Sequence, residues 1–340
     1  MQGKHEHVLV VSLQKSGTHL IADLMRKLGY TVFGWIIRDR DAPLPFDRQA
    51  REIAASLVLS PMQRRVLRLL SKTPLYDRIT EKALYGLMLS WGERLGVPWA
   101  SRHGHAYPHM LYSNPRLLTL SRKSIEHTPP NSCMIKHELP LAKTDGAFIR
   151  HWTETGKPAI IFNYRDPRDV LLSFINYFTG KTKTGKHGGF AEYFAYQDIL
   201  NAIEDPDQRL MHAIMDPSFP GHQDFYDSLW MLRHPKVCKV SYEELVGSAG
   251  GGSDEAQTRA VARVLEQVGI QADPAELADG LYNTKSFTFH KGQIGKWKEA
   301  FQPMHHAAFN ARQGEILKAY GYEPAVGNVD ARTANVSADG

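Results

Sequence analysis

Val8-Leu-Val-Val-Ser-Leu-Gln-Lys-Ser-Gly-Thr-His-Leu-Ile21 is the stretch that sets the expected fold. It joins an apolar run, Val8–Leu13, to a short polar turn and then to a helical pattern over Thr18–Leu28. Continuous apolar runs, unlike alternating ones, are typical of parallel strands covered on both faces. Three similar runs follow along the chain, at Ser132–Ile135, Ala159–Tyr164 and Lys236–Val240. Helical patterns lie between and after them, at Asp169–Phe178, Asp254–Val268 and Pro303–Tyr320. Strands alternating with helices predict an α/β, doubly wound fold with a central, mostly parallel sheet.

The turn after the first predicted strand carries groups that suit an anion. Gly17 permits a close backbone approach, and the N–H groups at the start of the helix would face a phosphate. Lys15 adds a positive charge, while Ser16 and Thr18 add hydroxyl donors. No Gly stands directly before Lys15, so the Walker A spacing of ATP and GTP hydrolases is absent. A surface turn with a capping Ser or Thr is the alternative interpretation.

Composition limits the class of protein. The 340 residues include 41 Lys and Arg against 36 Asp and Glu, a formal net charge of +5. Hydrophobic residues make up 42% and charged residues 23%, which excludes a largely disordered or collagen-like chain. The small positive excess suits an anionic ligand but is too small to indicate nucleic acid. Only two cysteines, Cys133 and Cys238, exclude a disulfide scaffold and fit a reducing compartment.

The order of segments predicts one interrupted domain over residues 1–324. The stretch Gly34–Pro130 is helical in pattern and rich in Leu, Met, Trp and Tyr, which predicts a large helical insertion. Its apolar side chains either pack into the core or form part of the wall of an apolar pocket. Residues 325–340 are small and polar, typical of a disordered tail. The N-terminus lacks the pattern of a signal peptide, and no run is long enough for a membrane span, so we expect a cytoplasmic protein.

A second strand, turn and helix recurs over Ile160–Phe174. Asp166 is a natural N-cap, and Pro167 suits the first helical position. Ser173 lies about two turns after Asp166, so Arg165 and Ser173 could grip an anion at the helix entrance. Arg165 and Arg168 could equally pair with Asp166 and Asp169 in a solvated cluster.

These motifs carry a family resemblance. Lys15-Ser-Gly-Thr18 resembles the 5′-phosphosulfate loop of the cytosolic-type sulfotransferases, and Tyr164–Phe174 resembles their 3′-phosphate motif, R-x-P-x-D-x-x-x-S. Val240–Leu245 resembles the segment whose Tyr lies near the adenine, and Phe289–Lys298 the C-terminal R-K-G-x-x-G-D-W-K loop. All four stand in the family's order. The resemblance implies a P-loop-like, three-layer fold and a transferase that uses 3′-phosphoadenosine 5′-phosphosulfate (PAPS) and releases 3′-phosphoadenosine 5′-phosphate.

The resemblance also implies which residues hold the cofactor. By this resemblance, the residues that would bind the 5′-phosphosulfate are Lys15, Ser16, Gly17, Thr18 and His19. Those that would bind the 3′-phosphate are Arg165, Ser173, His290, Lys291 and Gly292, and Tyr242 would lie near the adenine. Four positions depart from the family pattern: His19 replaces a Thr, Leu20 a Trp that often stacks on the adenine, His290 an Arg, and Lys296 an Asp, to which we assign no role.

The segment Met134-Ile-Lys-His-Glu-Leu-Pro140 resembles the family's K-T-H-L-P, in which the His is the general base. In register, Lys136 matches the sulfonate-contacting Lys, and Glu138 takes the position of the base. His137, one residue earlier, is the alternative, since its ordinary pKa suits base work near neutrality. Adjacent residues at a strand end point to opposite sides, so we expect only one to face the acceptor.

The function predicted from the sequence is sulfonate transfer to a hydroxyl of a small acceptor, favoured as apolar, aromatic or lipid-like by the Gly34–Pro130 stretch. The alternatives are a nucleotide-dependent phosphotransferase and a non-catalytic nucleotide-binding protein of the same fold. No His and Cys spacing indicates a metal site. The basic loop over residues 179–189 is either a mobile contact for an anionic group or a solvated loop.

Overall fold

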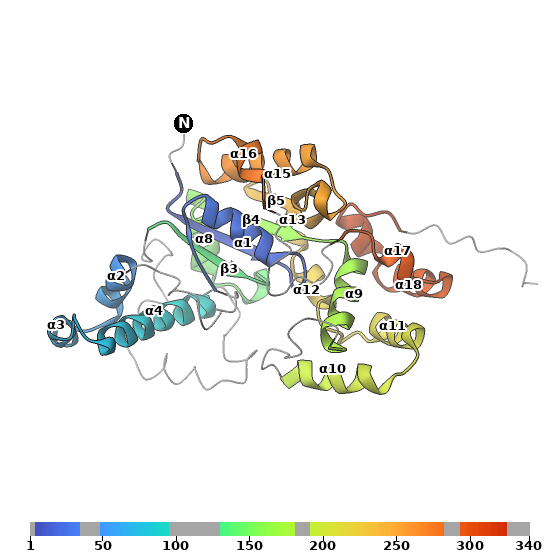
Figure 1. Cartoon of the computed structure of the whole chain (residues 1–340), viewed down its shortest axis with the longest axis horizontal. Helices are drawn as coiled ribbons and strands as arrows, with labels where there is room; N and C mark the ends of the chain where they lie inside the picture. The colour runs from blue at the N-terminus through green and yellow to red at the C-terminus, as the bar shows by residue number, and fades with distance from the viewer. Residues whose placement is uncertain (1–3, 35–47, 95–129, 181–190, 282–292, 325–340) are drawn as a thin grey trace, which may run out of the picture.

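The computed structural model describes residues 4–34, 48–94, 130–180, 191–281 and 293–324. At its centre is a five-stranded parallel sheet with the order β2-β3-β1-β4-β5 and helices on both sides (Figure 1). The strands are β1 (His7–Ser12), β2 (Thr31–Gly34), β3 (Ser132–Lys136), β4 (Ala159–Tyr164) and β5 (Val237–Ser241). The chain therefore has the α/β, three-layer, P-loop-like fold that the sequence predicts.

The sheet is buried on both faces, which explains why its strands are apolar throughout. All six residues of β1 are buried; Val8 and Val10 pack into one hydrophobic cluster, and Leu9 and Val11 into the other. Four predicted strands are confirmed with their ends shifted by no more than one residue. The edge strand β2 was not predicted, because four residues ending in Gly34 give too short an apolar signal.

Helices form the two outer layers. One cluster joins the sheet to residues of α1 (Thr18–Lys27), α14 (Tyr242–Leu245), α15 (Asp254–Val268) and α16 (Pro274–Ala278). The opposite face packs on α8 (Gly146–Thr155), α9 (Pro167–Phe178), α10 (Ala191–Ala202), α11 (Pro206–Met215), α12 (His222–Asp227), α13 (Leu229–Arg233) and α18 (Pro303–Ala319). Short helical segments complete the described chain at η2 (Leu141–Lys143), η3 (Ser248–Gly250) and α17 (Trp297–Ala300).

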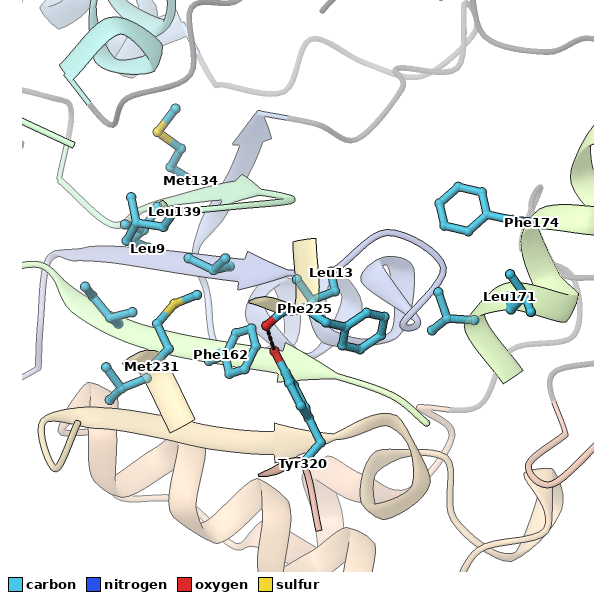
Figure 2. Close-up of a cluster of buried hydrophobic side chains, with 14 of the residues drawn as sticks. Leu9, Leu13, Met134, Leu139, Phe162, Leu171, Phe174, Phe225, Met231 and Tyr320 are labelled. Carbon is cyan, nitrogen blue, oxygen red and sulfur yellow. Dashed lines mark hydrogen bonds between the residues drawn. The ribbon is translucent and has the colours of Figure 1, made fainter. Parts of the chain in front are cut away.

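An aromatic core under β4 fixes the helices that carry the second motif (Figure 2). The Tyr320 ring lies 6.3 Å from that of Phe162, and its hydroxyl donates to the Phe225 carbonyl at 2.9 Å. Leu171 and Phe174, which project from α9, belong to the same cluster. Burial of this apolar surface therefore sets where the N-terminus of α9 meets the sheet.

Helices α2 (Arg48–Val58), α3 (Pro61–Leu69) and α4 (Pro74–Arg94) form an arm at one end of the molecule (Figure 1). They belong to the predicted insertion over residues 34–130, of which 35–47 and 95–129 lie outside the described residues. A single domain over 1–324 stays a prediction, and both the tail over 325–340 and most of the basic loop fall outside the description. Within the described ranges, no helix is both long and apolar enough to cross a membrane.

Candidate anion-binding and active site

The first loop, Leu13–Gly17, leaves the helix start of α1 open. Lys15 has φ 63° and Gly17 has φ 81°, so two residues of the turn adopt the left-handed conformation. Such a conformation is unusual for Lys and is typical of turns at functional sites. The N-cap residue of α1 is Gly17, which has no side chain that could cap the helix. The first N–H groups of α1 therefore remain for another acceptor.

Buried polar contacts from the neighbouring strand hold the loop in shape. Asn163, at the end of β4, donates from Nδ2 to Ser12 Oγ at 2.9 Å and to the Ser16 carbonyl at 2.8 Å. Ser12 Oγ in turn lies 2.9 Å from Thr18 Oγ1. Ser12 and Asn163 are aligned in the sheet and fully buried. Asn163 was missed at the level of sequence; the only available signal was an amide inside an apolar run.

Tyr242 packs directly against this loop. A Cβ built at Gly17 would lie 2.4 Å from Tyr242 Cδ2, a separation that no real Cβ contact shows. Any side chain at position 17 would therefore displace the ring. The Arg165 guanidinium lies over the same ring, with Cζ 4.4 Å from the centroid. The structure thus brings the predicted residues Gly17, Arg165 and Tyr242 together.

Arg165 joins three segments that are far apart in sequence. Its Nη1 lies 3.4 Å from the Lys15 carbonyl and its Nη2 donates to the Gln293 carbonyl at 2.9 Å. The same Nη2 lies 3.5 Å from Asp169 Oδ2. Arg165 therefore links the first loop, the start of α9 and the segment that follows the predicted residues His290, Lys291 and Gly292. Those three residues lie outside the described ranges.

Two buried donors of this site have no hydrogen-bond partner within the described structure: Ser16 Oγ and Arg165 Nε. Asn163 Oδ1 is in the same condition. Leaving a buried donor unpaired costs about 1–3 kcal/mol, and each such group in a native structure calls for an explanation. Both donors belong to the two predicted phosphate sites, so an anionic ligand with oxygen acceptors would satisfy them.

Lys15 projects toward α9, where its Nζ lies 4.3 Å from the centroid of the Tyr177 ring. Burial, together with the nearby Arg165 charge, lowers the pKa of Lys15 from 10.5 to about 8. Among the described residues, the Tyr177 ring is the group recorded against this ammonium, and it compensates in part for the lost water. A bound anion would restore that compensation and raise the pKa again.

The remaining predicted contacts lie on the two helices. Thr18 and His19 open α1 and are partly buried; desolvation is the main cause that lowers the pKa of His19. Ser173 is partly buried on α9, seven residues after the N-cap Asp166. The Asp166 carboxylate accepts from the Arg168 backbone N–H at 2.9 Å, and Pro167 occupies the first helical position, as predicted.

The charged cluster at the start of α9 is buried, which corrects the alternative of a solvated cluster. Asp166 accepts two side-chain hydrogen bonds from Arg168, at 2.9 and 2.7 Å, and Arg168 lies over the Trp297 ring at 3.6 Å. Asp169 accepts from the backbone N–H groups of Gly295 and Trp297 at 2.7 and 3.1 Å. The cluster was misjudged because its cover, residues 293–301, lies about 130 positions away in sequence.

The predicted catalytic segment follows β3, next to the first loop. Lys136 is 2% exposed and Glu138 is 8% exposed. The ring of His137, one residue earlier than Glu138, lies with Nδ1 2.8 Å from the Ser12 carbonyl. A carbonyl only accepts, so Nδ1 carries the proton in this contact. The ring of His137 is therefore turned toward the end of β1, and it ties the segment after β3 to the last residue of β1.

The converging polar groups of the site suit an anion. No group of three or more His, Cys, Asp or Glu side chains that could hold a metal ion occurs within the described ranges. The converging groups are two cationic side chains, a hydroxyl and an open helix start, which together suit phosphate or sulfate oxygens.

No protein-family model and no curated protein matches the chain. Among solved structures, mouse sulfotransferase SULT7A1 complexed with PAP is similar at 12% identity and a TM-score of 0.49, covering 94% of this chain and 87% of that one. Retinol dehydratase in a complex with retinol and PAP is similar at 13% identity and a TM-score of 0.42, covering 94% and 83%. The likeness to sulfotransferases thus appears in solved structures too, but with such values the function has to be argued from the residues of the site.

Proposed function

We propose that this chain is a sulfotransferase that uses PAPS and transfers its sulfonate group to a hydroxyl of a small apolar, aromatic or lipid-like acceptor. The observation that carries the proposal is a pair of buried donors, Ser16 Oγ and Arg165 Nε, that have no partner among the described residues and that follow the adjacent strands β1 and β4 at the two predicted phosphate sites. Arg165 contacts the first loop directly and stacks on Tyr242. A ligand with two separate anionic groups and a planar base suits this arrangement.

Each part of PAPS would be bound by a separate group of residues. The loop Lys15–Thr18 and His19 would hold the 5′-phosphosulfate, where the open start of α1 offers its N–H groups. Arg165 and Ser173, with His290, Lys291 and Gly292, would hold the 3′-phosphate, and Tyr242 would lie near the adenine. When bound, PAPS supplies an activated sulfonate group.

Two lysines would stabilise charge during transfer. Lys15, whose pKa of about 8 keeps it mostly protonated at pH 7, would face charge that develops on the leaving phosphate oxygen. Lys136, almost completely buried at the end of β3, would face the sulfonate oxygens. Fixed positive groups of this kind cost no reorganisation at the moment of reaction, as in phosphoryl transfer.

Glu138 is our proposed general base. The carboxylate would accept the proton of the acceptor hydroxyl, and in an extended segment it shares a side with Lys136, two residues earlier. His137 is the alternative base, because a proton on Nδ1 leaves the lone pair on Nε2. Its contact with the Ser12 carbonyl favours a positioning role, with the ring holding the segment after β3 against the end of β1. Both free cysteines are buried, so we place the activity in a reducing compartment, the cytoplasm.

Ligand-dependent melting tests the proposal first. Adenosine 3′,5′-bisphosphate at about a hundred times its dissociation constant should add roughly 2.7 kcal/mol of stability. AMP, which lacks the 3′-phosphate, should stabilise less, and Arg165→Lys should remove most of the difference between the two. Stabilisation by ATP but not by the bisphosphate would favour a phosphotransferase and refute the proposal.

Transfer from labelled PAPS to a panel of phenols, sterols and lipid alcohols tests the reaction itself. Glu138→Gln should lower turnover by about 10²–10⁴ while bisphosphate-dependent melting is kept. His137→Asn is the matched control, and it should lower turnover less. An inactive His137→Asn beside an active Glu138→Gln would move the base to His137. Binding without transfer to any acceptor would indicate a non-catalytic protein.

A further inference from the structure

Helix α3, on the arm, presents an uncovered stripe of apolar side chains. Met62, Val66 and Leu69 are 77%, 50% and 86% exposed. Their spacing of four and three residues places them on one face of the helix. Leu67 belongs to the hydrophobic core and is buried, so the helix is already anchored by a different residue. The exposed stripe is therefore not needed to attach α3 to the protein.

The segment that carries the stripe is basic and holds no acidic residue. Residues 59–76 contain Arg64, Arg65, Arg68 and Lys72 and no Asp or Glu. Arg65 borders the stripe, since it stands three residues after Met62 and four before Leu69. Arg65, Arg68 and Lys72 are exposed. A short basic helix with one apolar face is typical of segments that lie on an anionic membrane surface.

The stripe is held in a preformed position. Ser60 and Gln63 make a reciprocal capping box at the start of α3, with hydrogen bonds of 2.9 and 3.2 Å. An ion pair between Arg51 and Asp77, at 2.9 Å, joins α2 to α4 on either side of α3 in sequence. The helix lies at the outer end of the arm, away from the sheet (Figure 1). Within the described part of the chain, α3 is therefore accessible to a flat partner.

We propose that α3 docks this protein on an anionic lipid bilayer. Met62, Val66 and Leu69 enter the region of the headgroups, and Arg65 with its basic neighbours contacts the lipid phosphates. Charge complementarity selects this occupant, because a second copy of the chain on the same face would bring two sets of positive side chains together. Each Lys or Arg near such a surface contributes about fivefold in affinity, and the contribution is lost at high salt.

The docking stands independently of the proposed reaction. If both hold, the arm would bring the predicted acceptor region to a bilayer, which is where lipid-like acceptors are found. That link rests on the proposed function, whereas vesicle binding is measured without any cofactor. Failure of vesicle binding would therefore refute the docking alone, and failure of sulfonate transfer would refute the proposed reaction alone.

Sedimentation of the full chain with vesicles tests the docking. Vesicles of phosphatidylcholine with roughly 30% phosphatidylserine should bind the protein, whereas pure phosphatidylcholine should bind it at least about tenfold more weakly. The variant Met62→Gln/Val66→Gln/Leu69→Gln should weaken binding at least about tenfold. Arg65→Gln/Arg68→Gln/Lys72→Gln should weaken it about a hundredfold and remove its dependence on salt.

The matched control removes three exposed apolar side chains elsewhere: Phe194→Gln/Ile199→Gln/Met215→Gln, on and near α10 and α11. This variant should bind vesicles like the unmodified protein. Equal binding by all variants, or no binding to anionic vesicles, overturns the proposal. The proposal is also overturned if the α3 variants melt several degrees lower, because another part of the chain would then cover the stripe. A change of mass in solution would overturn it as well, because a second copy would then cover the stripe.

Discussion

The first loop and the start of α9 follow the same local plan of strand, turn and helix, yet they end in opposite electrostatic states. At α1 the N-cap is Gly17, which has no side chain to cap the helix, and the buried hydroxyl of Ser16 has no partner among the described residues. At α9 the N-cap is Asp166, whose carboxylate satisfies both the helix and the buried Arg168. The first site is therefore open to an external anion, whereas the second has its own.

The difference shows that a helix start becomes a ligand site only when the chain does not fill it. In the second motif, Arg165, which precedes the helix, carries the donor that remains for a ligand. The start of α9 itself is satisfied by carboxylates of the chain and holds neighbouring segments in place. These contacts extend to residues 293–301, because Asp169 holds the backbone of Gly295 and Trp297. Four predictions test this contrast between an open and a closed helix start.

The largest expected effect is on stability, at the closed site. Asp166→Ala removes the cap and leaves the Arg168 guanidinium buried without its carboxylate, which should cost about 3–5 kcal/mol of unfolding free energy. Urea denaturation measures this cost. Asp205→Ala is the matched control, since Asp205 also precedes a Pro and caps a helix but neutralises no buried Arg. That control should cost only about 1 kcal/mol; equal costs would contradict a closed ionic site.

At the open site the effect should fall on rate rather than on stability. Lys15→Ala removes a charge that faces the ligand, so turnover with PAPS should fall by about 10²–10³, while the melting temperature of the free protein stays close to that of the unmodified chain. Lys4→Ala is the control, because Lys4 also lies over a tyrosine ring, 4.7 Å from the centroid of Tyr30, but outside the site. A strongly destabilised Lys15→Ala would assign Lys15 to the fold instead.

The pH dependence of binding sharpens the contrast. Since the pKa of Lys15 is lowered to about 8, the free protein loses this proton as the pH rises through 8, well before the unfolded chain does. An anion prefers the protonated form, so the affinity for adenosine 3′,5′-bisphosphate should fall about tenfold from pH 7 to pH 9. Calorimetry measures the decrease.

The same linkage predicts that the free protein gains stability as the pH rises from about 8 to 10.5, because the unfolded state then binds more protons at this group. Lys15→Arg is the control, as its guanidinium does not titrate in this range. A decrease in affinity that persists in Lys15→Arg would have to come from another group.

The smallest effect is expected at Ser16. Its hydroxyl is buried and has no partner in the described structure, so Ser16→Ala should not lower the unfolding free energy, yet it should weaken bisphosphate binding by about fivefold. Ser12→Ala is the matched control: its hydroxyl contacts both Asn163 and Thr18, and its loss should cost about 1–3 kcal/mol. Thermal melts with and without the bisphosphate separate the two outcomes.

Much of the fold was readable because its signals are local. The buried strands are continuous apolar runs, and the cap at Asp166 with Pro167 at the first helical position depends on neighbouring residues alone. The edge strand β2 escaped prediction, since four residues carry no periodicity. Asn163 escaped too, because an amide in an apolar run gains its meaning only from Ser12 on β1 and from Ser16 in the loop that follows it.

By itself, the sequence determined the parallel sheet, the position of both turns and the residue types that each turn offers, since these follow from short-range sterics and the burial of apolar runs. Tertiary structure alone decided which charges are paired and buried. Whether Arg168 faces water or Trp297, and whether Arg165 reaches Lys15 and Tyr242, depends on segments more than 70 residues away. The physical reason is that burial and electrostatic pairing are properties of packed surfaces, which no local stretch of chain contains.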